Sequence, residues 1–221
     1  MNYEEHLSDT DVCVVAFASD GGNAFIPDVP NFEFGKSLSA LGCSHVLMRD
    51  TPDRWYTEGI EGLGDNEETA NYIRSLKNRY KKVITTGVSF GAWGSLMYGQ
   101  MASVNEIVAI SPLTVIGKAA ENELPKEWHH RISSDKSLDI KPLFSGPITP
   151  KIRIFVSDGD GTELDMFMAT RLGRYSIAYD APKSTLGQAR GIFYINVIHG
   201  HSHGGLAKHM RDEGWFEVLF R

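Results

Sequence analysis

The chain has 221 residues, of which 42% are hydrophobic and 23% are charged. These proportions are ordinary for a globular protein, and the length suits one domain with a substantial core. Lys and Arg together number 22 and Asp and Glu 28, which gives a formal charge of −6. Because a net negative chain repels phosphate backbones, a nucleic acid is not an expected partner. No apolar run approaches the roughly 18 residues of a membrane helix, so no membrane association is expected.

The first residues, MNYEEHLSDTD, are acidic and polar, and they lack the basic start and apolar stretch of a secretory signal. We therefore expect a cytoplasmic protein. The chain has two cysteines, Cys13 and Cys43. We expect both to be buried thiols and not disulfide partners, because a reducing compartment keeps thiols free.

Six short apolar runs rich in β-branched and aromatic residues predict buried strands of a mostly parallel sheet. In chain order they are 12–17, 45–49, 83–86, 106–110, 152–156 and 192–198. Most of the segments between these runs have helical patterns. The clearest is 66–80, where Asp65 and Glu68 predict a capping box and apolar residues follow at helical spacing. The alternation of strands and helices predicts an α/β fold that forms a single domain over residues 1–221.

Residues 113–150 interrupt this alternation. The segment contains four prolines and shows no clear strand pattern. We expect a lid-like excursion over one end of the sheet and not a separate domain.

A serine follows the strand at 83–86 in the pattern G-x-S-x-G, in which Gly87 and Gly91 flank Ser89. In this pattern the serine lies on a sharp turn between a strand and a helix, where neighbouring side chains would collide. The first N–H groups of the helix then point to the place where negative charge develops. The pattern predicts a nucleophile at Ser89, and the alternative is a glycine-rich turn with a bystander serine.

A nucleophilic serine needs a base and an acid that orients the base. Acidic residues follow the strand at 152–156, and histidines follow the strand at 192–198. Since the carboxyl ends of parallel strands meet at one edge of a sheet, we expect these groups to lie near the serine. The candidates are Asp158, Asp160 and Asp165 for the acid, and His199, His201 and His203 for the base.

These features resemble the α/β-hydrolase family, and more narrowly the small bacterial hydrolases encoded with polysaccharide-related genes. The resemblance rests on VITTGVSFGAWGSLMYG around the serine, with further similarity in VVAFAS, RWYTEG, AISPLTVI, DMFMATRL and HGGLAKHMRDEG. It implies an α/β-hydrolase-like sheet of about six strands flanked by helices. It also implies a serine esterase that cleaves a carboxylic ester or related acyl bond of a small molecule or glycan, with a catalytic triad and no cofactor.

The resemblance also ranks the candidates for the triad. Asp165 precedes an A-x-x-L stretch similar to one in the relatives, and it is the first choice for the acid. Asp160 is the second choice and Asp158 the third. Both are candidates because they lie closer to the end of the strand, where many α/β hydrolases carry the acid. His203 precedes a Gly-Gly pair and a final helix, as in the relatives, and His201 is the alternative base.

The oxyanion hole is expected to use two backbone N–H groups. One is that of Phe90, and the other comes from the turn after the first predicted strand, where Ala18 or Ser19 lies. The relatives often have Met in place of Phe90, so we expect Phe90 to alter the pocket wall and not the nucleophile. Trp55 and Tyr56 could wall the same pocket, although packing in the core is the favoured interpretation.

Two other hypotheses remain open. In the first, His199, His201 and His203 alternate along a strand, share one face of it, and bind Zn²⁺ with nearby aspartates in a metal-dependent hydrolase. In the second, the chain is a non-catalytic binding module with the same fold. A complete set of triad candidates favours the serine hydrolase, for which no metal is expected.

Overall fold

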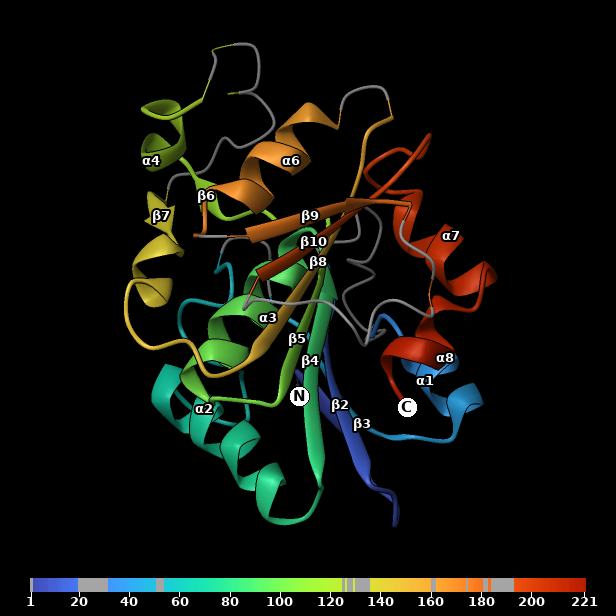
Figure 1. Ribbon diagram of the computed structural model, residues 1–221. Coiled ribbons are helices and arrows are strands. Elements are labelled where there is room, and N and C mark those ends of the chain that lie inside the picture. The colour runs from blue at the N-terminus through green and yellow to red at the C-terminus, as the bar shows by residue number, and fades with distance from the viewer. Residues whose placement is uncertain are drawn as a thin grey trace.

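The computed structural model describes residues 2–19, 32–50, 54–124, 126, 129, 136–159, 162–173, 175–180, 183 and 193–221. An eight-stranded sheet runs through the molecule in the order β1-β3-β2-β4-β5-β8-β10-β9 (Figure 1). Neighbouring strands are parallel, except that β1 is antiparallel to β3. The strands are β1 (Tyr3–His6), β2 (Val12–Phe17), β3 (Ser44–Met48), β4 (Lys82–Val88), β5 (Glu106–Ile110), β8 (Lys151–Ser157), β9 (Tyr175–Tyr179) and β10 (Phe193–Ile198).

The predicted α/β fold with a mostly parallel sheet is confirmed, and all six predicted strands are present in it. Two edge strands, β1 and β9, are not predicted from the sequence. Both are polar or largely exposed, with β1 reading YEEH and β9 reading YSIAY. A continuous apolar run predicts a strand that is buried on both faces. An edge strand does not need such a run, so these two segments lack the pattern that predicts the others.

Helices cover both faces of the sheet (Figure 1). The helices α2 (Asn66–Ser75) and α3 (Phe90–Met101) pack on one face. The opposite face is covered by α1 (Gly35–Leu41), α7 (Leu206–Asp212) and α8 (Trp215–Leu219). None of the helices in the described ranges is long and apolar enough to cross a membrane.

Strand β2 shows how the sequence produces this sandwich. Val15 and Phe17 contribute to the core beneath α2 and α3, whereas Val14 and Ala16 contribute to the core beneath α7 and α8. Since successive side chains of a strand point to opposite faces, a run such as VCVVAF supplies both cores at once. All four residues are at most 1% exposed.

The predicted capping box at the start of α2 is confirmed. The Asp65 carboxylate accepts the N–H of Glu68 at 2.9 Å, and the Glu68 carboxylate accepts the N–H of Asp65 at 2.9 Å. A 3₁₀ turn, Leu76–Asn78, continues the helix toward β4.

The excursion at 113–150 contains more regular structure than the sequence predicts. Two short strands, β6 (Val115–Ile116) and β7 (Leu138–Asp139), form an antiparallel pair outside the main sheet. The segment also holds α4 (Lys118–Glu121) and a 3₁₀ helix, Lys141–Phe144. The expectation of no strand here is wrong, because a strand of two residues is too short to produce a hydrophobic pattern. Apolar side chains of the excursion pack on α6 (Glu163–Thr170), the helix that follows β8.

Both cysteines are free thiols; Cys13 is buried as expected, whereas Cys43 is only partly buried, so the expectation that both are buried is wrong for Cys43. Cys13 lies in the core of the sheet, and burial raises the pKa of its thiol to about 12. Burial also raises the pKa of the Cys43 thiol.

Candidate active site

Ser89 lies on the turn that joins β4 to α3, with φ 52° and ψ −113°. Residues other than glycine rarely have such a positive φ, so the turn is strained. The backbone packs too closely here for side chains on the flanking residues. A Cβ on Gly87 would lie 2.2 Å from the Gly91 oxygen, and a Cβ on Gly91 would lie 2.1 Å from the Phe17 oxygen. The sequence G-x-S-x-G therefore folds into the sharp turn that the pattern predicts.

His203 and Asp165 form a hydrogen-bonded pair. His203 lies in the turn between β10 and α7, and its Nδ1 is 2.8 Å from Oδ1 and 2.9 Å from Oδ2 of Asp165. Asp165 belongs to the first turn of α6 and its side chain is 1% exposed. Because a carboxylate accepts hydrogen bonds, Nδ1 is the donor in this pair, and Nε2 is the ring nitrogen left to contact another group.

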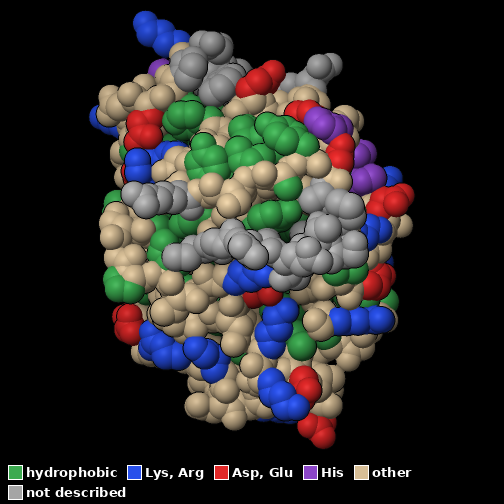
Figure 2. Space-filling view, viewed as in Figure 1, with side chains coloured by type: hydrophobic (Ala, Val, Ile, Leu, Met, Phe, Trp, Pro, Cys, Tyr) green, Lys and Arg blue, Asp and Glu red, His purple; other side chains and the backbone are tan. Residues whose placement is uncertain are grey.

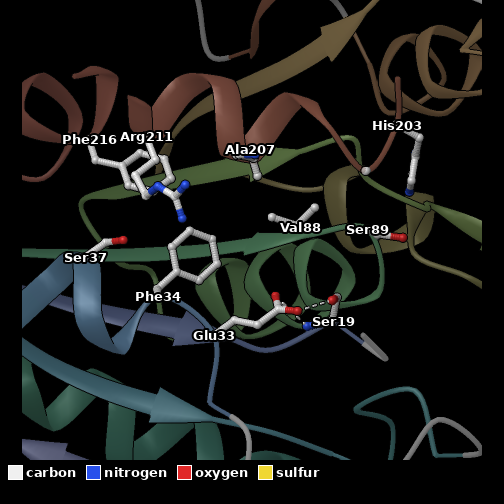
Figure 3. Close-up of a pocket in the computed structure, with 12 residues that line it drawn as sticks. Ser19, Glu33, Phe34, Ser37, Val88, Ser89, His203, Ala207, Arg211 and Phe216 are labelled. Carbon is white, nitrogen blue, oxygen red and sulfur yellow. Dashed lines mark hydrogen bonds between the residues drawn. The ribbon is translucent and has the colours of Figure 1, made fainter. Parts of the chain in front are cut away.

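Ser89 and His203 line the same cavity, whose volume is about 600 Å³. Figure 3 shows the imidazole of His203 beside the Ser89 hydroxyl, with a ring nitrogen on the side that faces it. The pocket thus brings Ser89 next to the pair formed by His203 and Asp165. No hydrogen bond between Ser89 and His203 is present among the described contacts, and such bonds often form only when a substrate binds.

The other histidines and aspartates have different partners. His199 is exposed, and its Nδ1 bonds to the carboxylate of Asp158. Its Nε2 lies 3.4 Å from Oδ2 of Asp180. His201 stacks on His209, with ring centres 3.9 Å apart. Figure 2 shows histidine and acidic side chains side by side on the surface near α7. Asp160 lies outside the described residues.

The three histidines do not alternate along a strand, because β10 ends at Ile198 and the histidines occupy the turns that follow. They therefore do not share the face that the metal hypothesis requires. Within the described ranges, no group of three or more His, Cys, Asp or Glu side chains could hold a metal ion.

The backbone donors near Ser89 are Phe90 and Ser19. Phe90 is the first residue of α3, so its N–H has no acceptor within the helix. Of the two candidates for the second donor, Ala18 donates its N–H to the Met48 oxygen at 2.8 Å, so this N–H is not available to an oxyanion. The Ser19 N–H instead donates to Oε2 of Glu33 at 3.0 Å, and Ser19 and Glu33 both line the pocket.

The aromatic residues near the turn pack into the core. The Phe90 side chain is 3% exposed and contacts the rings of Trp55 and Tyr56, with centres 4.9 and 4.8 Å away. The expectation that Phe90 forms the pocket wall is therefore wrong. Tyr56 is fully buried, and its hydroxyl donates to the Ala18 oxygen at 2.7 Å. Packing is thus the role of Tyr56, which supports the end of β2 beside the serine turn.

No protein-family model and no curated protein sequence matches the chain. Solved structures do match it. A mutant capsule O-acetyltransferase of Neisseria meningitidis serogroup A in complex with CoA aligns with a TM-score of 0.59 and 14% identity, covering 99% of this chain and 91% of that chain. A lipase-esterase related protein from Clostridium acetobutylicum aligns with a TM-score of 0.55 and 12% identity over 96% of each chain. The fluorophosphonate-binding serine hydrolase F of Staphylococcus aureus aligns with a TM-score of 0.51 and 12% identity, covering 96% of this chain and 85% of that chain. This chain has the α/β-hydrolase fold.

In this α/β-hydrolase fold, the charged residues that line the pocket beside Ser89 and His203 are not predicted from the sequence. Glu33 precedes α1, and no motif distinguishes it. Arg211 lies on α7 and lines the pocket together with Lys208. Lys208 and Arg211 are three residues apart on the predicted final helix, so their side chains lie on one face of it. This spacing is the one feature of the sequence that could have indicated a basic end of the pocket.

Proposed function

We propose that this protein is a serine hydrolase that cleaves carboxylic esters through an acyl-enzyme intermediate. The observation that carries the proposal is the buried Asp165 holding His203 in the pocket that contains the strained Ser89. A hydroxyl, a base with one free nitrogen and an orienting acid are the parts that acyl transfer needs.

In the proposed reaction, Nε2 of His203 takes the proton of the Ser89 hydroxyl while Oγ attacks the acyl carbon. Asp165 keeps the imidazole in the required tautomer and stabilises the imidazolium that forms. The same proton then passes to the leaving alcohol, and water activated by His203 releases the acid. Phe90 supplies one N–H to the oxyanion. The Ser19 N–H supplies the second after it exchanges the Glu33 carboxylate for the substrate oxygen.

The expected substrates are acyl esters of small molecules or glycans. Likeness to a capsule O-acetyltransferase favours a second candidate, in which a hydroxyl group replaces water and accepts the acyl group. We place the protein in the cytoplasm, an assignment that its two free thiols support.

The first test is hydrolysis of p-nitrophenyl esters of increasing acyl length by the wild type and by Ser89→Ala and His203→Ala. We expect both variants to lose activity by roughly 10³-fold or more, because the two residues act as a unit. EDTA should not change wild-type activity, because the proposed reaction uses no metal ion. Activity that survives in Ser89→Ala contradicts the proposal, and a wild type inactive on every ester favours the binding module.

A further inference from the structure

The pocket extends well beyond the serine. Figure 3 shows Ser89 and His203 at one end and Arg211 at the other, with Val88 and Ala207 between them. These intervening side chains are apolar. The pocket therefore has a reactive end, an apolar middle and a cationic end.

A second hollow of about 370 Å³ continues the pocket between α1 and α8. It shares Ser37, Arg211 and Phe216 with the first. We call the combined depression the α1–α7 groove and define it by the residues that line these two hollows. Its four basic side chains are Lys36, Lys208, Arg211 and Arg221, and its two acidic side chains are Glu33 and Glu217.

The charge of the groove is opposite to that of the chain. The chain has a formal charge of −6, whereas the groove has more cations than anions. Glu33 lies between the two ends in Figure 3, with its carboxylate bonded to Ser19 and pointing away from Arg211. Lys208 makes no ion pair within the described part of the chain. Among the residues that the structure describes, Arg211 pairs only with the adjacent Asp212, at 2.8 Å, and its side chain is 51% exposed. An exposed pair of this kind is weak, so the guanidinium can bind a second anion.

The geometry points to an anionic substrate. We infer that the α1–α7 groove binds acyl esters that carry a carboxylate or phosphate group remote from the ester bond. The ester lies at Ser89, the connecting part of the substrate contacts Val88 and Ala207, and the anion binds Arg211 and Lys208. This inference rests on the proposed function, because it assigns the ester to Ser89.

The test compares esters that differ only in charge. Mono-p-nitrophenyl adipate carries a free carboxylate, methyl p-nitrophenyl adipate is its neutral partner, and a phosphonate of equal chain length represents phosphate. We expect kcat/KM of the wild type to favour the anionic esters by about twofold to fivefold at low salt, the range of one exposed ion pair. The better of the two anionic esters identifies the source of the charge.

Variants locate the effect. The preference should fall toward unity in Arg211→Gln and Lys208→Gln and should reverse in Arg211→Glu. Lys81→Gln is the matched control, because Lys81 is an exposed lysine outside the groove whose side chain is 79% exposed. Salt near 1 M should also reduce the preference, since it shortens the Debye length to about 3 Å.

Binding separates this inference from the catalytic proposal. In Ser89→Ala, calorimetry with the three adipate-type esters measures affinity without turnover, so it gives a result even if no ester is hydrolysed. Tighter binding of the anionic esters, lost in Ser89→Ala/Arg211→Gln, supports the groove. Equal affinity for charged and neutral esters, or no binding of any of them, overturns it, whatever the hydrolysis assays show.

Discussion

At the scale of single residues, the pairing of His203 with Asp165 is the contact on which the proposed chemistry depends. Asp165 is 1% exposed, and both of its carboxylate oxygens face Nδ1 of His203. A buried carboxylate without such a partner would be costly, so the pair also stabilises the contact between α6 and the turn before α7. The same two residues therefore organise the site and connect the elements that carry it.

Replacing Asp165 by Asn tests this pairing. We expect Asp165→Asn to lower kcat for a p-nitrophenyl ester by on the order of 10³–10⁴-fold, because an amide stabilises the wrong imidazole tautomer and cannot stabilise the imidazolium. The measurement is steady-state kinetics, with circular dichroism to verify the fold. Asp158→Asn is the control, since Asp158 pairs with the exposed His199. A large loss of kcat in Asp158→Asn together with a small loss in Asp165→Asn would show that Asp165 is not the acid that orients His203.

The sequence identifies Ser89 more sharply than its partners for a physical reason. The serine turn is local, and five consecutive residues contain its steric requirement. The choice among the aspartates depends instead on how α6 docks beside the turn after β10, a contact between residues 38 positions apart. Glu33 and Ala18 show the same limit, because their hydrogen bonds join segments that no local pattern links.

At the scale of elements, the turn between β4 and α3 combines tight packing with a partly buried Ser89 that lines the pocket. Ser89 donates its N–H to the Ile110 oxygen at 2.9 Å, which fixes the turn to β5. Gly87 and Gly91 allow β4, α3 and the end of β2 to approach closely. The strain at Ser89 is thus maintained by the packing of the elements around it.

We expect Gly87→Ala to destabilise the protein by about 1–3 kcal/mol, the usual cost of overpacking a tight core. The new Cβ would lie 2.2 Å from a backbone oxygen, which cannot move without moving Ser89, so esterase activity should fall as well. Urea unfolding and ester hydrolysis measure the two effects. Gly146→Ala is the matched control, because a Cβ there meets nothing within 4 Å. If both variants are equally stable, the packing argument fails.

The elements themselves were predictable where they are buried. Successive side chains of each central strand point into the two cores in turn, so each strand needs a continuous apolar run. Such runs are visible in the sequence. The edge strands β1 and β9 and the short pair β6–β7 were missed, because partners elsewhere in the chain stabilise them more than their own composition does.

At the scale of the whole molecule, Arg171 connects the excursion to the helix that carries Asp165. Its guanidinium, on a side chain 4% exposed, donates to the carboxylates of Glu123 and Asp139. It also donates to the Thr114 oxygen at 3.0 Å. The excursion at 113–150, which the sequence predicts to be lid-like, is therefore attached to the C-terminal end of α6, the helix that carries Asp165.

The pKa of Asp139 gives this contact a defined dependence on pH. Burial opposes the charged form, but hydrogen bonds from Arg171 and from the Lys141 N–H outweigh it and lower the pKa below the ordinary 3.8. Because the folded pKa is lowered, the stability that Asp139 contributes is present above the ordinary value and is lost as pH falls through the folded value. We expect Asp139→Asn to reduce the free energy of unfolding near neutral pH but to make less difference at about pH 3, as measured by urea unfolding. An equal loss at both pH values would contradict this account.

The central claim is that the Ser89 hydroxyl is a nucleophile activated by His203. Its most direct measurement is reaction with a fluorophosphonate probe, followed by mass spectrometry of the digested protein. We predict one adduct, on the peptide that contains Ser89, with no labelling of Ser89→Ala and much slower labelling of His203→Ala. A wild type that is not labelled, or a Ser89→Ala variant labelled as fast as the wild type, would contradict it.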